Sequence, residues 1–181
     1  MSGHISVLLP ESIAYLDVQD GGTYVDLTLG RGGTSSAILK KIPHGRLYSF
    51  DLDEEAIESS KERLDAIGSN YELIHANFKA FKQELLARGV TQLNGLTADL
   101  GVSSPQFDEG ERGFSYKEEA PLDMRMDLRN TLTAERIVNT YSEKDLIRIF
   151  ARYGEDPDSA RVAKAIVRER INRPIITTTE L

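Results

Sequence analysis

Strand-length apolar segments alternate with helical segments through the first hundred residues, and this alternation limits the possible folds more than any other feature. Strands are expected over residues 23–29, 46–51, 71–76 and 93–100. A helix capped by Thr34 or Ser35 should follow the first strand, and further helices are expected over 53–66 and 81–87. β-Branched and aromatic residues are frequent in the expected strands, as is typical of buried strands. Strands alternating with helices of this length indicate a parallel sheet with right-handed crossovers. The sequence therefore predicts an α/β fold.

The second part of the chain has a different organisation. Residues 101–127 have no clear period and are too long for a routine connection, which indicates a functional loop. Helices are expected over residues 133–140, 142–153 and 158–171. We divide the chain into residues 1–107, the N-terminal part of the sheet domain, and residues 108–181, the loop with a small all-α inserted domain.

The C-terminal residues are expected to begin another helix. Residues 177–181 have the pattern of a helix cap and first turn. An open parallel sheet of this kind also normally continues beyond its fourth strand. We therefore expect the chain to be truncated at its C-terminus, which leaves its activity as a fragment open.

Composition narrows the functional classes. The net charge of −7 argues against nucleic-acid binding through the overall field, although it allows a local basic face. The chain has no cysteine and only three scattered histidines, so no metal site is expected. The start does not resemble a signal peptide and the apolar runs are strand-length, so we expect a cytoplasmic protein without membrane contact.

A glycine-rich turn, Gly30-Arg31-Gly32-Gly33, follows the first expected strand. Such a turn brings backbone N–H groups and a helix start close to a ligand, although the same pattern also serves as a tight strand-to-helix turn. Asp51 lies about 20 residues further on, at the end of the second strand, where a carboxylate accepts hydrogen bonds from ribose hydroxyls. Asp53 is better placed as the helix cap. Together these features predict a Rossmann-like nucleoside site.

The details of the turn favour one cofactor. It lacks the third glycine that packs a helix under a dinucleotide pyrophosphate. Asp26 adds negative charge beside the turn, which would repel a pyrophosphate but not a cationic aminoacyl group. We therefore expect S-adenosylmethionine in place of a nicotinamide dinucleotide. Phe78, at the same sheet edge, could flank the adenine or could be a core aromatic residue.

Longer motifs resemble one family. They are His4-x-x-Val7-Leu8-Leu9, Asp26-x-Thr28-x-Gly30-Arg31-Gly32-Gly33, Asp99-Leu-Gly-Val-Ser-Ser-Pro-Gln106, Arg112-Gly-Phe-Ser115 and Pro121-Leu-Asp-Met-Arg-Met126. Together they are similar to the family of ribosomal RNA small subunit methyltransferase H, over essentially the whole chain. The resemblance implies a Rossmann-like, S-adenosylmethionine-dependent methyltransferase sheet. It also implies methyl transfer to the N4 amine of a cytidine in small-subunit ribosomal RNA.

The resemblance also implies site residues. Besides Gly30, the cofactor contacts would be Gly32, Gly33, Thr34, Asp51, Phe78, Asp99 and Gln106. The family usually has histidine at the position of Thr34, so only a backbone or hydroxyl contact carries over there.

The N4 amine of cytosine is a poor nucleophile, because its lone pair is shared with the ring. A site must accept its N–H hydrogens and align nitrogen, methyl and sulfur. Asp99, Ser103, Ser104 and Pro105 are the candidate catalytic residues, although Asp99 could instead only cap its own loop. A target base would have to leave its stack. Phe107, Phe114 and Tyr116 could then hold it or could pack the loop.

Basic residues are candidates for binding small-subunit ribosomal RNA or the small ribosomal subunit. Arg161, Lys164 and Arg168 recur on one side of the last expected helix, and Arg112 lies in the loop. A solvated helix face is the alternative explanation for the first three. A non-catalytic RNA-binding or ribosome-assembly module remains the alternative function.

Overall fold

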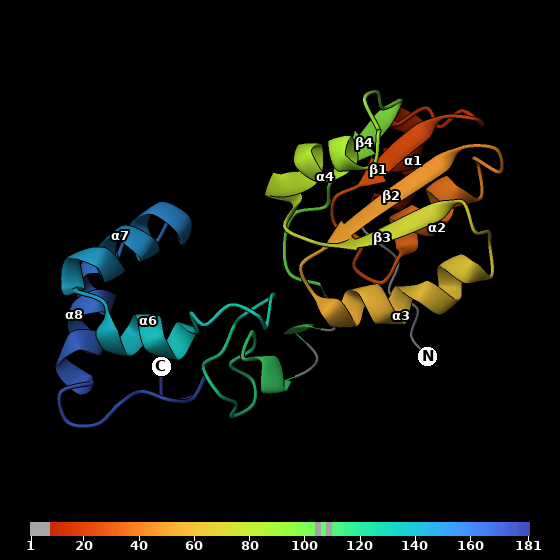
Figure 1. The fold of residues 1–181 in the computed structure, drawn as a ribbon. Coiled ribbons are helices and arrows are strands. Elements are labelled where there is room, and N and C mark those ends of the chain that lie inside the picture. The colour runs from red at the N-terminus through yellow and green to blue at the C-terminus, as the bar shows by residue number, and fades with distance from the viewer. Residues whose placement is uncertain (1–7, 104–105, 108–109) are drawn as a thin grey trace. The chain divides into compact units, whose positions relative to one another are not determined.

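The computed structural model describes residues 8–103, 106–107 and 110–181. The chain forms two compact units, residues 1–101 and residues 102–181 (Figure 1). Each unit has hydrophobic core residues of its own. The boundary after residue 107 that the sequence suggested stays a prediction.

The first unit is built on a four-stranded parallel sheet in the order β3-β2-β1-β4. The strands are β1 (Thr23–Asp26), β2 (Arg46–Asp51), β3 (Tyr71–His75) and β4 (Gly95–Thr97). Strand β1 lies in the middle, with Val25 paired to Tyr48 of β2 and to Leu96 of β4. The α/β, Rossmann-like fold predicted from the alternation is confirmed.

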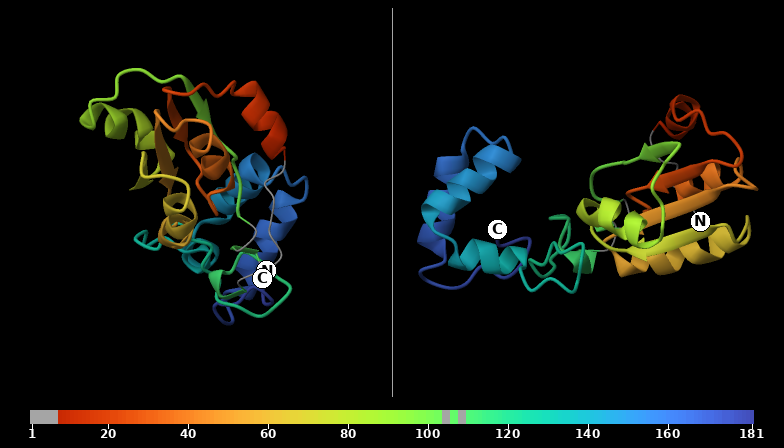
Figure 2. Two further views of the ribbon diagram at one scale, coloured as in Figure 1. Left: turned by 90° about the vertical axis from the view of Figure 1, so that its right-hand side faces the viewer. Right: turned by 45° about the horizontal axis from the view of Figure 1, so that its top comes forward.

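Helices cover both faces of this sheet because successive strand residues point to opposite sides. The helices are α1 (Leu9–Tyr15), α2 (Gly33–Leu39), α3 (Glu54–Asp65) and α4 (Phe81–Ala87). Tyr24 and Leu47 pack with residues of α1, α2 and α3 on one face. Val25 and Phe50 pack with Leu85 of α4 on the other. The left view of Figure 2 shows the sheet between α4 and α1.

The second unit is a loop region followed by three helices. After the short η2 (Gly110–Arg112) come α6 (Ala134–Thr140), α7 (Glu143–Tyr153) and α8 (Ser159–Glu169). Their core contains Leu122, Val138, Leu146, Ala163, Ile166 and Ile175. The expected cap of α7 is confirmed, since the Ser142 hydroxyl accepts from the Asp145 amide at 3.1 Å. No helix in the described ranges is long and apolar enough to cross a membrane.

The last residues hold a helix-capping arrangement. The Glu180 carboxylate accepts from the Thr177 amide at 3.2 Å, and the Glu180 amide donates to the Thr177 hydroxyl at 3.3 Å. This reciprocal pair is the capping box that starts many helices. The expected cap and first turn at residues 177–181 are therefore present.

A polar cluster is buried in the first unit where β1, β2 and α2 meet. The Ser35 hydroxyl donates to Asp26 Oδ2 at 2.7 Å and lies 2.8 Å from the Ser49 hydroxyl. The sequence suggested Thr34 or Ser35 as the cap of α2, which is wrong. The helix begins after Gly32, no side chain caps it, and Ser35 serves the buried carboxylate instead. Burial raises the pKa of Asp26 to about 6, and the negative charges of Asp51 and Asp99 also raise it.

We predict that Asp26→Asn removes part of the pH dependence of stability. The folded-state pKa of Asp26 lies above the usual value of 3.8, so the folded protein binds a proton more tightly than the unfolded chain. Stability should therefore rise as the pH falls through about 6, by about 1 kcal/mol between about pH 7.5 and about pH 5. Urea unfolding of both proteins at the two pH values measures this gain. Equal pH dependence in wild type and variant would contradict the assignment.

Candidate cofactor site

The glycine turn after β1 has the backbone shape that its glycines predict. Gly30 and Gly32 have φ angles of 50° and 73°, in the region that disfavours other residues. A Cβ on Gly30 would meet no atom within 4 Å, whereas one on Gly32 would lie 3.2 Å from Ser60 Cβ. Gly32 thus allows the turn to pack against α3, and Gly30 leaves the backbone open to close approach.

Asp51, at the end of β2, lies against this turn. Its Oδ2 accepts from the Gly30 amide at 2.9 Å, and its Oδ1 accepts from the Asp53 amide at 2.9 Å. Burial raises the pKa of Asp51. A carboxylate oxygen can accept more than one hydrogen bond, so both oxygens can also accept from ligand hydroxyls. The structure therefore brings together the two features that the sequence singled out, while their contact with a cofactor stays a prediction.

Asp53 caps α3, as expected. Its side chain accepts from the Glu55 amide at 3.2 Å. The division of roles between Asp51 and Asp53 follows from this geometry, since Asp51 holds the glycine turn and Asp53 caps the helix.

Asp99 follows β4 and is exposed. Its amide donates to Thr28 Oγ1 at 2.7 Å, which ties the segment after β4 to the segment between β1 and the glycine turn. The carboxyl edge of the sheet thus carries three carboxyl groups, those of Asp26, Asp51 and Asp99. Their negative charges interact closely enough to raise the pKa of Asp26.

Phe78 and Thr34 lie in the same unit and are both half-buried. Phe78 opens the short helix η1 (Phe78–Ala80) and packs against the core on the α4 face of the sheet. This packing fits the core role that the sequence left open, and a contact with adenine through the remaining surface stays a prediction. Thr34 is the second residue of α2, directly after Gly33.

The remaining candidates for cofactor binding and catalysis belong to the second unit. Gln106 is buried, and its Oε1 accepts from the Ser103 amide at 2.9 Å. Gln106 therefore stabilises its own turn, a role that the motif alone did not indicate. Ser104 and Pro105 lie outside the described residues.

Arg112 has a structural role that the sequence did not predict. Its Nη2 donates to the carbonyl of Arg125 at 2.9 Å, and its own carbonyl accepts from the Met124 amide at 3.0 Å. Arg125 in turn binds both carboxylate oxygens of Asp123, which lowers the pKa of that carboxyl. The Arg112 side chain thus helps to hold the 121–126 segment, and its predicted RNA contact remains untested.

The basic residues of α8 lie as the helical spacing predicted. Arg161, Lys164 and Arg168 are exposed, whereas Ala163 and Ile166 on the other side are buried. Two of these cations have acidic neighbours, since Arg161 pairs with Asp158 at 2.7 Å and Arg168 with Glu169 at 2.8 Å.

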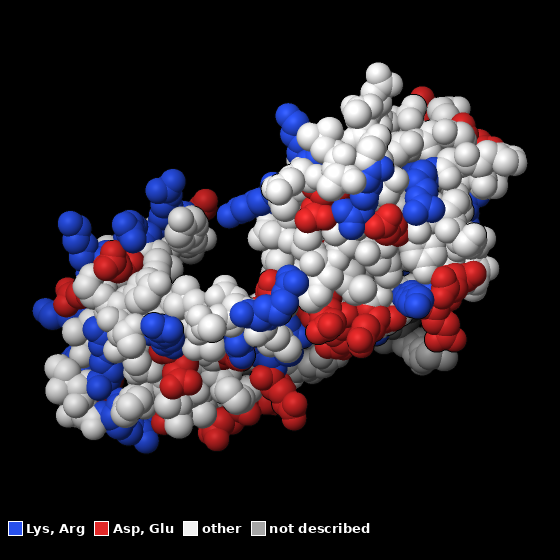
Figure 3. Space-filling view, in the orientation of Figure 1, with Lys and Arg blue, Asp and Glu red and all other residues white. Residues whose placement is uncertain are grey.

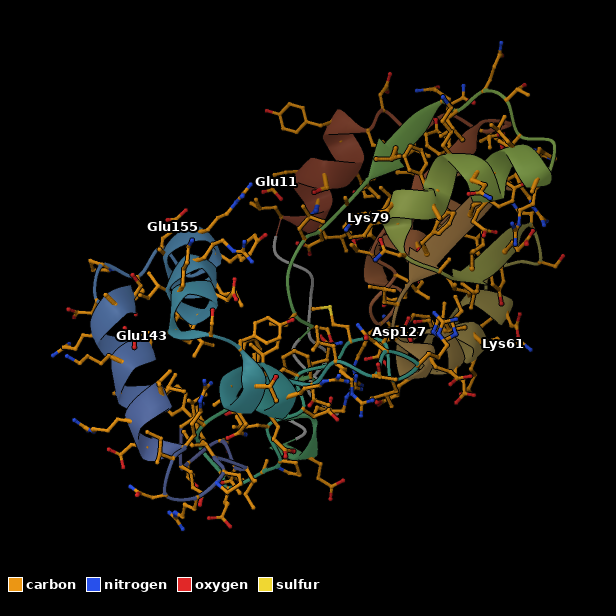
Figure 4. All side chains as sticks on the ribbon, turned by 60° about the vertical axis from the view of Figure 1, so that its left-hand side comes forward. Glu11, Lys61, Lys79, Asp127, Glu143 and Glu155 are labelled. Carbon is orange, nitrogen blue, oxygen red and sulfur yellow. The ribbon has the colours of Figure 1, made fainter. Side chains whose placement is uncertain are left out.

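A second row of cations lies on α7 and was not identified from the sequence. Lys144, Arg148 and Arg152 are exposed at four-residue spacing, between Glu143 and Glu155 near the two ends of the helix (Figure 4). Their spacing was the signal that could have revealed them. Figure 3 shows Lys and Arg spread over the helical unit with Asp and Glu among them. Within the described ranges, no group of His, Asp and Glu has the arrangement of a metal site.

Comparisons with known proteins assign this sequence to a family. The sequence profile of the MraW methylase family matches residues 1–181. The ribosomal RNA small subunit methyltransferase H of Clostridioides difficile strain 630 is 50% identical over 179 residues, covering 98% of this chain. The protein of the same name from Mesoplasma florum is 48% identical over 182 residues, covering 100% of this chain.

Both alignments cover 58% of the relative, so this chain spans less than two thirds of the length of these proteins. Among solved structures, an rRNA methylase from Streptococcus thermophilus is 22% identical with a TM-score of 0.40, covering 66% of this chain and 72% of that one. The profile match over residues 1–181 shows that the chain belongs to the MraW methylase family.

Proposed function

We propose that this chain carries the cofactor site of an S-adenosylmethionine-dependent methyltransferase that methylates the N4 amine of a cytidine in small-subunit ribosomal RNA. The observation that carries the proposal is the Gly30–Asp51 hydrogen bond. It joins an open glycine turn to a carboxylate in a chain of a methylase family. The relatives named as small-subunit rRNA methyltransferases support small-subunit ribosomal RNA as the substrate.

The residues present fit S-adenosylmethionine. Asp51 has lone pairs left for ribose hydroxyls, and the backbone at Gly30 is open to close approach. The carboxyl groups of Asp26, Asp51 and Asp99 make this sheet edge acidic, which suits a cationic ligand and repels a pyrophosphate. The cofactor supplies an electrophilic methyl group on a positively charged sulfur.

The task left to the protein is to orient the acceptor amine and to accept its N–H hydrogens. We assign that task to Asp99, Ser103, Ser104 and Pro105. Asp99 is suited to it because it is exposed and because the Thr28 hydroxyl fixes its backbone. The oxygens of an ionised carboxylate only accept hydrogen bonds, so such a group can accept one from an amine N–H.

The RNA partner is assigned to the exposed cations of the helical unit. Phosphate binding depends on Lys and Arg side chains that can reach the backbone. The exposed cations of α8 and α7 provide such groups although the chain as a whole is acidic. A non-catalytic RNA-binding module would share these residues but would not need the open glycine turn.

We predict that Gly30→Ala selectively weakens cofactor binding. The added Cβ would occupy the open side of the turn and keep a ligand from the backbone, so affinity for S-adenosylmethionine should fall by about tenfold or more. Calorimetric titration with S-adenosylmethionine and, in parallel, with NAD measures the affinity and separates the two cofactor classes.

Gly89→Ala is the matched control. Gly89 also has a positive φ, 75°, and no atom within 4 Å of an added Cβ, but it lies at the end of α4, away from the glycine turn. Both substitutions should cost about 1–2 kcal/mol of stability through backbone strain. The cofactor site is wrongly placed if both variants bind S-adenosylmethionine equally well.

We predict that reversing charge on α8 weakens RNA binding. Arg161→Glu with Lys164→Glu should remove two phosphate contacts and lower the slope of log affinity against log salt by about 2. Filter binding to small-subunit ribosomal RNA at several salt concentrations measures it. Lys40→Glu with Lys41→Glu, at the exposed end of α2, changes the net charge equally and should have little effect. An equal loss in both pairs would indicate an effect of overall charge alone.

A further inference from the structure

Thr28 connects the two segments that carry the proposed cofactor residues. It lies between β1 and the glycine turn and is half-buried. Its amide donates to Asp26 Oδ1 at 3.1 Å, and its hydroxyl oxygen accepts from the Asp99 amide at 2.7 Å. Thr28 therefore makes one hydrogen bond toward the core and a second one toward the segment after β4.

The second bond lies where backbone pairing between β1 and β4 ends. The last register pair is Asp26 with Thr97, followed by a bond from the Leu27 amide to the Thr97 carbonyl at 2.9 Å. Two residues after Thr97, the Asp99 amide donates to the Thr28 side chain and not to a backbone carbonyl. The path that Asp99 takes away from the sheet thus depends on a hydroxyl group.

Asp26 holds the other end of this connection. Its Oδ1 accepts from Thr28, and its Oδ2 accepts from the Ser35 hydroxyl at 2.7 Å. The Asp26 residue is only 1% exposed, so water cannot readily replace either partner. Leaving a buried polar group without its partner costs more free energy than an exposed hydrogen bond contributes. The contacts of Asp26 with Thr28 and Ser35 are therefore hard to break.

We propose that Asp26 and Thr28 are positioning residues, which fix the segment carrying Asp99 relative to the glycine turn through the contacts Ser35–Asp26–Thr28–Asp99. The consequence for cofactor affinity rests on the proposed function. The hydrogen bonds themselves can be tested without any ligand.

Substitutions of Thr28 separate the hydroxyl from the shape of the side chain. Thr28→Val has nearly the same shape but no acceptor for the Asp99 amide, whereas Thr28→Ser keeps the oxygen and loses the methyl group. Thr28→Ala also removes the oxygen and takes the place of Thr28→Val should that variant not fold. Thr91→Val, at an exposed threonine before β4, is the control.

The first measurement is amide hydrogen exchange of the ligand-free 181-residue chain by NMR. Thr28→Val should lower the protection of the Asp99 amide by about tenfold, and Thr28→Ser should keep it within about threefold of wild type. Thr91→Val should leave it unchanged. Unchanged protection in Thr28→Val, or a loss in Thr28→Ser as large as in Thr28→Val, would overturn the proposal.

The second measurement is calorimetric titration of the same proteins with S-adenosylhomocysteine. Affinity should fall by about tenfold in Thr28→Val and recover in Thr28→Ser. If the wild-type chain does not bind, the proposed function fails for this chain, and the exchange measurement still decides whether Thr28 holds Asp99. If wild type and Thr28→Val bind equally well, the hydroxyl does not position the cofactor site and the proposal is overturned.

Discussion

The buried carboxyl group of Asp26 connects the sheet, the following helix and the candidate site. It lies at the end of the central strand, accepts from Ser35 of α2 and from the Thr28 amide, and is almost fully removed from water. A buried carboxylate is costly unless it is hydrogen-bonded. The start of α2 and the segment before the glycine turn are therefore held where they can satisfy this group, and the position of the turn depends on it.

The same sheet edge gathers carboxyl groups, while α7 and α8 each expose a row of Lys and Arg side chains. Asp51 and Asp99 lie near Asp26 at the carboxyl end of the sheet, where ligands gather in open α/β folds. The cations of α7 and α8 are exposed on the other unit. The net charge of −7 does not reveal these local arrangements, because an overall sum says nothing of where the charges lie. These two local arrangements are the basis of the proposed cofactor site and of the proposed RNA contacts.

Local sequence patterns predicted a residue's role correctly where a single short-range hydrogen bond determines that role. The caps at Asp53 and Ser142 could be predicted because a side chain bonds to a backbone amide two or three residues away. The pairing of Gly30 with Asp51 could be expected because parallel strands end at one edge of a sheet. The role of Ser35 could not, since its hydroxyl was free either to cap α2 or to reach a distant carboxylate. Only the packing of α2 on the sheet decides between them.

The sequence by itself determined the alternation of strands and helices, the glycine turn and the acidic residue that follows it. These depend on periodicity and on backbone freedom, which are local properties. The tertiary structure alone decided that Arg112 supports the 121–126 segment and that the Thr28 hydroxyl holds the Asp99 amide across 71 positions of sequence. Those contacts join residues far apart in the chain, and no local pattern specifies which donor will meet which acceptor once the sheet has formed.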